Sequence, residues 1–594
     1  MCRADAWPLE KARAANNTSI TPAQLIVILL GACVQLGVTG SAAPNCVAIG
    51  ARTARWSPEL VGDDARKPRA VGLAGWQCDL MMHAEQLNPE ACYRALQTRD
   101  GRFDGRLFVG VISTGIYCRP TCPARTPKFE NCRFFPSAAA AQEAGFRPCL
   151  RCRPETAPNL GSWLGTSNTV SRGLALIAEG ALDGERTNVE VLAGRLGVGG
   201  RQLRRLFKQH LGVSPIAIAQ TRRVLFAKQL IHDTRMPMTE IAVAAGFGSL
   251  RRFNETFQRL FRRPPSALRR KTVLPLPAGS VGAIGVTLRL RYRPPYDWPA
   301  MLVHLRAHAV TGVECVVNEV YRRTVQHDGQ LGTIEVGQLP ERESLVVTIR
   351  FPSVRALPTI VGRIRRVFDL GADVAAIAAH LAQDPLLAPL VAERPGLRVA
   401  GSWDGFELAV RTALSQHLSV EAARRLVSRL VRLCGTPLPA ELCVGTTLTA
   451  CFPSAANIVA ANLAPLQMPS ARKAMLMALA EANLAAPSLF QAPTTIKDTI
   501  ARLRAIRGIS EWTARYIALH AVHEPDAFPA FDIALRRGAA GVDAQRSSPA
   551  GLNDRAEPWR PWRAYAAQHL WAADAALQSA SSAALRQMLS SSTS

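Results

Sequence analysis

The chain has 594 residues, more than one hydrophobic core can organise, and this length predicts roughly three to five domains. Lysine and arginine number 71 against 45 acidic residues, and the resulting net charge of +26 points to nucleic acid or another anionic surface as a partner. The 14 cysteines are sparse and irregular along most of the chain, which excludes a disulfide framework and predicts a reducing, intracellular compartment.

The first 80 residues differ in character from the rest of the chain. Leu25–Val38 is an apolar run of 14 residues, too short to span a bilayer comfortably and similar to the apolar region of a signal peptide. No good cleavage site of small residues follows it. We therefore expect residues 1–80 to be a disordered or spurious extension, with a membrane anchor as the alternative.

Four cysteines in the next segment have the spacing of a metal site. Cys118 and Cys122 are followed, after 26 intervening residues, by Cys149 and Cys152. A C-x3-C pair with a C-x2-C pair is a strong signature of tetrahedral zinc, and zinc keeps a coordinating thiol in its thiolate form. Because a thiolate is nucleophilic, the site could hold a fold together, accept an alkyl group, or do both.

The residues around these cysteines carry a family resemblance. STGIYCRPTCPAR at 113–125 and AGFRPCLRCRP at 144–154 resemble the methylphosphotriester-acceptor domain of Ada-type alkylation-response proteins. The resemblance covers residues 81–158 and implies one zinc ion, with Cys118 accepting a methyl group from DNA and the other three cysteines as remaining ligands. Arginines crowd the cysteines, as a phosphate-facing surface requires, although a solvated basic face is the alternative. These arginines are Arg119, Arg125, Arg147, Arg151 and Arg153.

Residues 161–271 show helical periodicity with a repeated pattern. Asn188–Lys208 and Met238–Arg259 each predict a helix, a glycine-containing turn and a second helix, and an amphipathic helix over Pro215–Asp233 joins them. The tandem resembles the AraC-type DNA-binding domain, which implies promoter binding and transcription activation; a plain helical bundle is the alternative. The side chains expected to meet DNA are Arg201, Gln202, Arg204, Arg251 and Arg252.

After residue 283 the sequence pattern changes twice. Residues 284–370 alternate apolar and polar positions in segments such as SLVVTIRF, which predicts a small α/β domain with an antiparallel sheet. Residues 371–575 are rich in alanine and leucine and predict helices. The low-complexity end, residues 576–594, is predicted to be a disordered tail.

The helical region contains a second chemical motif. Leu503–Tyr516, LRAIRGISEWTARY, predicts two helices joined by a tight hairpin, where backbone amides near Gly508 and Ser510 would bind a DNA phosphate. The motif resembles the helix-hairpin-helix of base-excision DNA glycosylases. Three further segments resemble the AlkA-type 3-methyladenine glycosylases in particular, and this resemblance covers residues 284–575. The segments are 293–302, 393–420 and 558–571.

The glycosylase resemblance implies roles for particular residues. Asp532 follows the hairpin where the family places a catalytic carboxylate, which would stabilise a developing sugar cation. An aromatic cleft would hold the cationic base, and a wedge would fill the vacated base stack. Taken singly, the aromatic residues are as well explained by core packing and Asp532 by helix capping. The cleft residues are Trp512, Tyr516 and Trp571, and the wedge residues are Gln416 and His417.

The sequence departs from these families at several places. Ser510 stands where glycine is usual, so we expect a weaker phosphate contact, because serine lacks the freedom of glycine at positive φ. His417 stands where the type enzyme has leucine. No lysine lies in the hairpin, which predicts a monofunctional glycosylase, and no PCHR motif occurs, which predicts no repair of O-methylated guanine.

These segments predict a multidomain α+β fold class. Its parts are a small zinc-bound α/β domain, an all-α tandem helix-turn-helix domain, a small antiparallel-sheet α/β domain and an all-α helix-hairpin-helix domain. We expect a bacterial cytoplasmic monomer at the nucleoid, with double-stranded DNA and RNA polymerase as partners and no membrane contact. Two alternatives stay open: an activator whose glycosylase-like domain is inactive, and a glycosylase whose zinc domain is purely structural.

Overall fold

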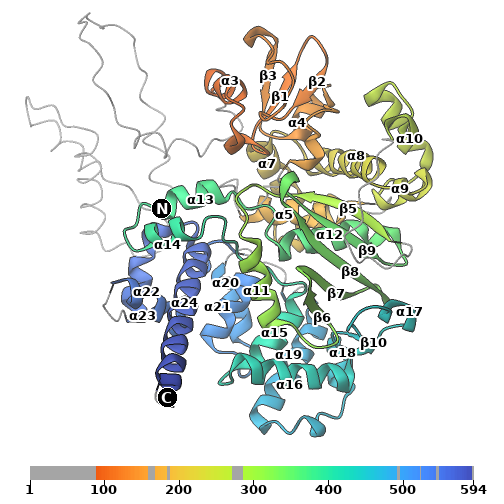
Figure 1. The fold of residues 1–594 in the computed structure, drawn as a ribbon. Coiled ribbons are helices and arrows are strands. Elements are labelled where there is room, and N and C mark those ends of the chain that lie inside the picture. Colours follow the sequence, from red (N-terminus) through yellow and green to blue (C-terminus); the bar gives the residue numbers. More distant parts are fainter. Residues whose placement is uncertain are drawn as a thin grey trace, which may run out of the picture. The chain divides into compact units, whose positions relative to one another are not determined.

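The described residues of the computed structural model belong to the larger of two compact units, Gln77–Ser594 (Figure 1). The extension predicted for residues 1–80 lies outside the described residues. The structure describes residues 88–157, 168–183, 188–269, 285–487, 489–490, 496–521, 524–543 and 548–591.

The zinc domain is built on a four-stranded sheet with strand order β3-β1-β2-β4. Asn88 and Ser137 begin its two main helices with side-chain oxygens that accept backbone N–H groups. The parallel pairing of Tyr117 with Pro148 brings the ends of β2 and β4 together, and those ends carry the two cysteine pairs. The elements are α3 Pro89–Gln97, β1 Phe108–Val111, β2 Ile116–Cys118, β3 Cys132–Phe135, α4 Ala138–Glu143 and β4 Arg147–Pro148.

Helices α5 to α10 form the DNA-binding module, and its two predicted helix-turn-helix units are confirmed. Gly197 and Gly246 have φ of +72° and +84° in the turns before α7 and α10, a conformation that side chains disfavour. The predicted connecting helix is α8, Pro215–Asp233. The other helices are α5 Asn168–Ala178, α6 Val189–Arg195, α7 Gly200–Leu211, α9 Met238–Ala244 and α10 Leu250–Phe261.

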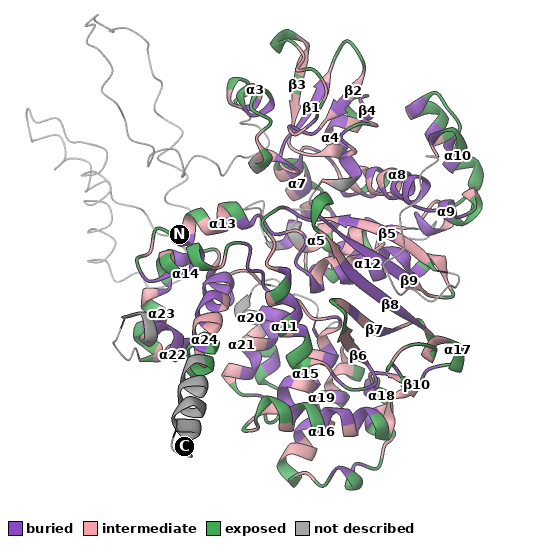
Figure 2. Ribbon diagram, viewed as in Figure 1, coloured by how far each residue is buried: buried purple, intermediate pink, exposed green. Residues whose placement is uncertain are grey.

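The next domain is the predicted antiparallel sheet, with strand order β5-β9-β8-β7-β6. Strands β8 and β9 are largely buried (Figure 2). Their core continues into the helix-turn-helix module, because Phe253 and Leu288 belong to one buried apolar cluster. The elements are β5 Val286–Arg291, α11 Trp298–His308, β6 Glu314–Val317, β7 Val320–His327, β8 Gln330–Leu339, β9 Ser344–Arg350 and α12 Leu357–Val367.

The C-terminal region is helical apart from one two-residue strand pair, β10 and β11. A helical domain was predicted here, and the observed elements confirm the predicted four-part fold class. The helices are α13 Val374–Leu381, α14 Leu387–Glu393, α15 Gly405–Ser415, α16 Val420–Cys434, α17 Ala440–Cys443, α18 Ala455–Ala460, α19 Ser470–Ala485, α20 Ile496–Arg504, α21 Glu511–His520, α22 Ile533–Asp543, α23 Pro549–Arg555 and α24 Arg563–Ser591. The strands are β10 Thr436–Pro437 and β11 Ala450–Cys451.

The last helix corrects one prediction. Helix α24 ends at Ser591, so most of the tail predicted to be disordered, residues 576–594, is helical. Its serines alternate with alanine, leucine, glutamine and methionine, which are strong helix formers and continue a helix already anchored at its start. None of the described helices is both long and apolar enough to cross a membrane.

Candidate zinc centre, DNA interface and base-excision site

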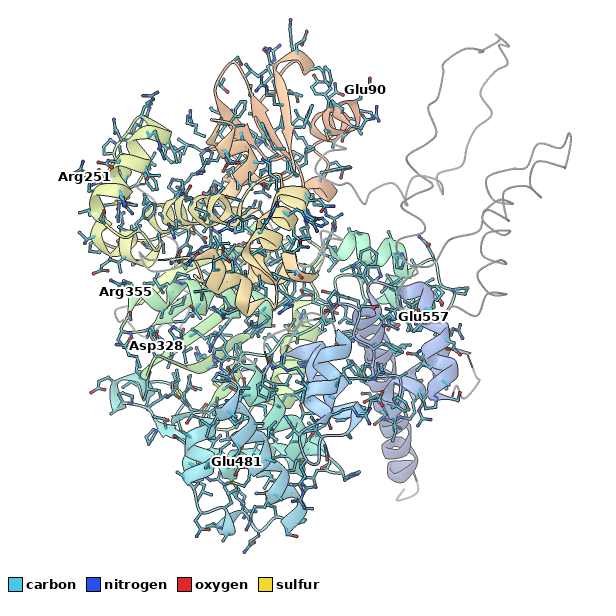
Figure 3. All side chains as sticks on the ribbon, turned by 180° about the vertical axis from the view of Figure 1, so that it is seen from behind. Glu90, Arg251, Asp328, Arg355, Glu481 and Glu557 are labelled. Carbon is cyan, nitrogen blue, oxygen red and sulfur yellow. The ribbon has the colours of Figure 1, made fainter. Side chains whose placement is uncertain are left out.

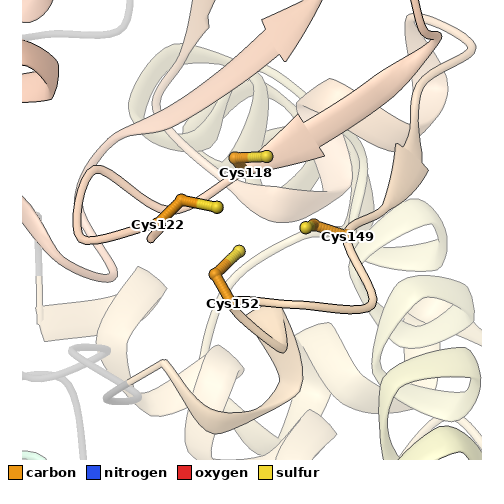
Figure 4. A group of neighbouring side chains, drawn as sticks. All are labelled: Cys118, Cys122, Cys149 and Cys152. Atoms are coloured by element: carbon orange, nitrogen blue, oxygen red, sulfur yellow. The ribbon is translucent and has the colours of Figure 1, made fainter. Parts of the chain in front are cut away.

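The four predicted zinc ligands converge on one point. Figure 4 shows the side chains of Cys118, Cys122, Cys149 and Cys152 pointing toward a common centre. Their Sγ atoms all lie within 4.8 Å of one another. Zinc–sulfur bonds of about 2.3 Å require such separations in a tetrahedral site, so the four thiols fit one zinc ion.

Cys118 differs from the other three ligands in its exposure and its hydrogen bonding. Cys118 is half-exposed, whereas the other three cysteines are buried. Cys152 Sγ accepts the backbone N–H of Arg119 at 3.4 Å and Cys149 Sγ that of Arg151 at 3.3 Å, while Ala124 supplies a backbone hydrogen bond to Cys122. These bonds draw negative charge from three sulfurs that do not face solvent. Cys118 is therefore the most accessible of the four sulfurs.

A cavity of about 330 Å³ opens at Cys118. Arg125, Arg147 and Arg151 line it together with the cysteines. Arg125 and Arg151 are exposed and Arg147 is half-buried. The structure therefore places three of the predicted phosphate-facing arginines around the same cavity as Cys118.

Arg119 and Arg153 are placed differently from the prediction. Arg119 is 6% exposed, forms a salt bridge with Asp104 and donates from Nη1 to the Cys152 carbonyl oxygen at 3.1 Å. Burial alone would lower the pKa of Arg119, but the hydrogen bond and charge of Asp104 raise it. Arg153 bonds Asp233 of α8 at 3.1 Å. Both guanidinium groups thus stabilise the loop that carries Cys152. They do not form part of an open surface that faces a phosphate.

A buried ion network joins the zinc centre to α8, and sequence reasoning missed it. Lys228 is fully buried, and its Nζ lies 2.7 Å from Glu155 Oε2 and donates to the Cys149 carbonyl oxygen at 2.9 Å. Burial raises the pKa of Glu155, but the charges of Lys228 and Arg153 outweigh it and hold this pKa below its ordinary value. No local pattern marks these residues, because Lys228 and Glu155 are 73 positions apart.

The predicted DNA-reading side chains lie on exposed faces of the two second helices. Arg201, Arg204, Arg251 and Arg252 are exposed, and Gln202 is half-buried. Arg251 projects from the outer side of α10 (Figure 3) and forms an intrahelical ion pair with Glu255 at 2.7 Å. Such exposed pairs are weak, so both helices remain available to a DNA groove.

Asp532 lies between two indole rings in the C-terminal region. Its Oδ2 accepts the indole N–H of Trp512 at 2.9 Å, and its Oδ1 accepts that of Trp571 at 3.1 Å. Oδ1 also accepts the backbone N–H of Leu535 at 3.0 Å, in the first turn of α22. The three donors are all neutral, so the carboxylate is oriented without a cationic partner among them.

The three predicted cleft residues form one aromatic cluster. The Trp512 and Tyr516 rings stack at 5.3 Å, and Trp571 lies edge-on to Tyr516 at 6.2 Å. Burial, and then the charge of Asp532, raises the pKa of Tyr516 to about 12, which keeps its hydroxyl protonated at neutral pH. His520 was missed, although it continues the four-residue spacing of Trp512 and Tyr516 and stacks on Trp571 at 6.0 Å.

The hairpin corrects the expectation for Ser510. Gly508, not Ser510, has positive φ, at +88°, and a Cβ at Gly508 would lie 2.9 Å from Met475. Ser510 has φ of −75° and begins α21, with its hydroxyl accepting the backbone N–H of Thr513. Glycine's freedom is therefore not required at Ser510. His417 of the predicted wedge is exposed and has φ of +59°.

Together these sites define a class of protein: a DNA repair enzyme joined to a DNA-binding transcription regulator. Family models match residues 91–155 as the metal binding domain of Ada, residues 192–271 as a helix-turn-helix domain and residues 287–404 as the AlkA N-terminal domain. The chain is 40% identical over 485 residues to the "Probable bifunctional transcriptional activator/DNA repair enzyme AlkA" of Mycobacterium tuberculosis H37Rv, covering 81% of this chain and 96% of that protein. The chain belongs to this family of bifunctional transcriptional activator/DNA repair enzymes.

Two further relatives each match one part of the chain. "DNA-3-methyladenine glycosylase 2" of Escherichia coli K12 is 31% identical over 288 residues, which are 48% of this chain and 95% of that protein. "Bifunctional transcriptional activator/DNA repair enzyme AdaA" of Bacillus subtilis 168 is 29% identical over 189 residues, which are 31% of this chain and 84% of that protein. The predicted cofactor is confirmed: the N-terminal domain binds one zinc ion at the four-cysteine cluster.

Proposed function

We propose that this chain senses and repairs alkylated DNA by two separate chemistries. Cys118 takes a methyl group from a DNA methylphosphotriester, and the C-terminal region releases alkylated purines such as 3-methyladenine. The observation that carries the excision half is the Asp532 carboxylate between the indole N–H groups of Trp512 and Trp571. The names of the two further relatives support the assignment of these two activities to separate parts of the chain.

Methyl transfer uses a thiolate beside a phosphate-binding surface. The zinc ion, when bound, keeps Cys118 deprotonated. The sulfur attacks the methyl carbon, a sulfur–carbon bond forms, and the carbon–oxygen bond breaks with its electron pair leaving on the phosphodiester oxygen. Arg125, Arg147 and Arg151 would hold the phosphate at the mouth of the cavity. The thioether product is stable, so Cys118 reacts once.

The methylated protein would then bind its promoter more tightly. Conversion of a thiolate to a neutral thioether removes one negative charge from a surface that meets DNA, and the gain is larger at low salt. Arg201 and Arg251 stand on two recognition helices of one chain, so a monomer can contact two successive major grooves. RNA polymerase at the promoter, in the bacterial nucleoid, would be the protein partner.

Base excision uses the cluster around Asp532. An alkylated purine carries positive charge, so Trp512 and Tyr516 would hold the extruded base by cation–π attraction. The C1′–nitrogen bond breaks with its electron pair leaving on the base, and Asp532 stabilises the developing sugar cation. Water adds to C1′ and loses one proton to the solvent, which gives a free base and an abasic site.

The test is incubation of the full chain with methylated duplex DNA, followed by mass measurement of the intact protein and of the released bases. We expect one added methyl group per protein and free alkylated purine in amounts exceeding the protein. Methylated protein without released base would favour an activator with an inactive glycosylase-like domain. Released base without methylated protein would favour a purely structural zinc domain.

A further inference from the structure

A chain of hydrogen bonds connects the DNA-facing hairpin to the wedge. Gln416 Nε2 donates to the Thr513 hydroxyl at 2.8 Å, and the Thr513 hydroxyl lies 3.0 Å from the Ser510 hydroxyl. Ser510 is exposed at the start of α21, whereas Thr513 is fully buried. The chain therefore runs from the surface that the hairpin offers to a phosphate, through a buried hydroxyl, to the residue before His417.

The hydroxyl protons and acceptor positions of Thr513 and Ser510 give this series of hydrogen bonds a direction. The Thr513 oxygen accepts from Gln416, so its own proton needs an acceptor, and a buried hydroxyl proton without one is costly. The Ser510 oxygen is that acceptor, and it also accepts the backbone N–H of Thr513 at 3.1 Å. With both of its acceptor positions used, Ser510 keeps one proton to donate outward. A phosphate oxygen at the hairpin is the acceptor that would complete the chain.

The Thr513 hydroxyl is not needed for helix capping, because Ser510 caps α21 through the backbone N–H of Thr513. A buried helical threonine commonly donates to the carbonyl four residues earlier, and Thr412 in α15 does so, to Leu408 at 2.8 Å. Thr513 instead faces the neighbouring helix and bonds Gln416. Its side chain thus has a partner outside its own helix.

Gln416 is held from a second side as well. Arg472 of α19 donates to the Gln416 carbonyl oxygen at 2.8 Å. Gln416 is the C-cap of α15, and His417 follows with φ of +59°. With its amide and its carbonyl both held, Gln416 has little freedom, and the position of His417 follows from it.

We propose that Thr513 is a positioning residue for base extrusion, through which the phosphate-binding hairpin sets the wedge residue Gln416. This inference rests on the proposed base excision. A phosphate bound at Ser510 polarises the two hydroxyls in sequence and strengthens the bond to Gln416. Gln416 is then held in place while the hairpin binds the DNA. The base leaves the stack during this bound state.

The experiment compares full-length variants on two DNA substrates under single-turnover conditions. One duplex carries an N-methylated purine in a normal base pair, and the other carries it unpaired in a small bubble, where no wedge is needed. Thr513→Val keeps the volume and removes the hydroxyl, and Thr513→Ser restores it. Thr412→Val is the matched control, a buried threonine whose hydroxyl serves only its own helix. Gln416→Met removes the donor without altering α21.

We expect Thr513→Val and Gln416→Met to slow release from the paired duplex by about tenfold, the rate equivalent of one or two lost hydrogen bonds. Release from the bubble should change less than about twofold, Thr513→Ser should recover most of the paired-duplex rate, and Thr412→Val should leave both rates unchanged. Equal losses on both substrates, or no loss on either, would overturn the proposal. If the unaltered protein releases no base from either substrate, the proposed excision itself is wrong.

Discussion

The zinc centre and the base-excision site hold their reactive groups in opposite ways. Cys118 is fixed by a metal and by three neighbouring sulfurs, and the ligands come from two short segments at the ends of paired strands. Asp532 is fixed by hydrogen bonds from Trp512 and Trp571, which are 59 residues apart along the chain. Metal bonds would suit the single reaction proposed for Cys118. Exchangeable hydrogen bonds would suit the repeated use proposed for the Asp532 carboxylate.

The two sites also treat charge differently. Around the zinc centre, buried cations and anions neutralise one another, as Lys228, Arg153 and Glu155 do. Around Asp532 the hydrogen-bond donors are two indoles and one backbone amide, none of which carries charge. The Asp532 carboxylate is therefore oriented by three neutral hydrogen-bond donors. The difference teaches that the loop beside the zinc centre is held by buried ion pairs, whereas Asp532 is oriented by neutral donors.

The largest effect should come from Cys118→Ser. We expect complete loss of methyl transfer, because the acceptor sulfur is gone, and an unchanged rate of base release, because the two sites share no residue. Protein mass after incubation with methylphosphotriester DNA and the amount of free base are the two measurements. A variant that still gains a methyl group would show that another ligand is the acceptor.

Lys228→Met tests whether buried ion pairs stabilise the zinc domain. Removing the Nζ charge leaves Glu155 buried beside Arg153 and His232, and leaves the Cys149 carbonyl oxygen without this donor. We expect the zinc domain to lose about 3 kcal/mol of stability, the lower end for a broken buried ion pair. The loss of stability is measured by thermal unfolding, with the release of zinc as the signal. Lys128→Met, at an exposed lysine of the same domain, is the control and should change the midpoint little.

Asp532→Asn should separate binding from chemistry at the excision site. The shape of the side chain is kept, but the charge is lost and one oxygen becomes an amide that cannot accept an indole N–H. We expect base release to fall on the order of 10²-fold, or about 2.7 kcal/mol, while abasic-site DNA still binds. Single-turnover release is compared with that of Asp554→Asn, an exposed carboxylate on α23. Equal losses in both variants would refute the assigned role.

The smallest expected effect is the share of the acid sensitivity that comes from one buried histidine of the C-terminal region. Burial lowers the pKa of His569 in α24 from 6.5 to about 4. Because the unfolded chain takes up this proton first, folding is most stable above pH 6.5 and weakens as the pH falls toward 4. At pH 5 the loss is about 2 kcal/mol.

His569→Gln removes this titrating group and should reduce the loss of stability between pH 7 and pH 5. Unfolding midpoints at pH 7 and pH 5 measure the change, with His327→Gln, at a half-exposed histidine of β7, as the control. If the two variants keep the same acid sensitivity, the buried imidazole is not its source.

The sequence by itself determined the parts of this protein that depend on local spacing. Cysteine pairs four and three positions apart predicted the zinc ligands, two glycine turns predicted both helix-turn-helix units, and alternating apolar segments predicted the antiparallel sheet. These signals are readable because each is set within one turn of helix, one hairpin or one strand. The C-terminal tail was mispredicted because composition indicated disorder, whereas helix propensity and an anchored start carry α24 to Ser591.

Only the tertiary structure decided which side chains meet across the chain. It buried Arg119 against Asp104, placed Lys228 beneath the zinc loop, and directed the Thr513 hydroxyl toward Gln416. It also showed that Ser510 needs no positive φ, because the turn uses Gly508 instead. These contacts join residues between 15 and 97 positions apart, and their geometry depends on how helices and strands pack together. No local pattern of residues encodes that packing.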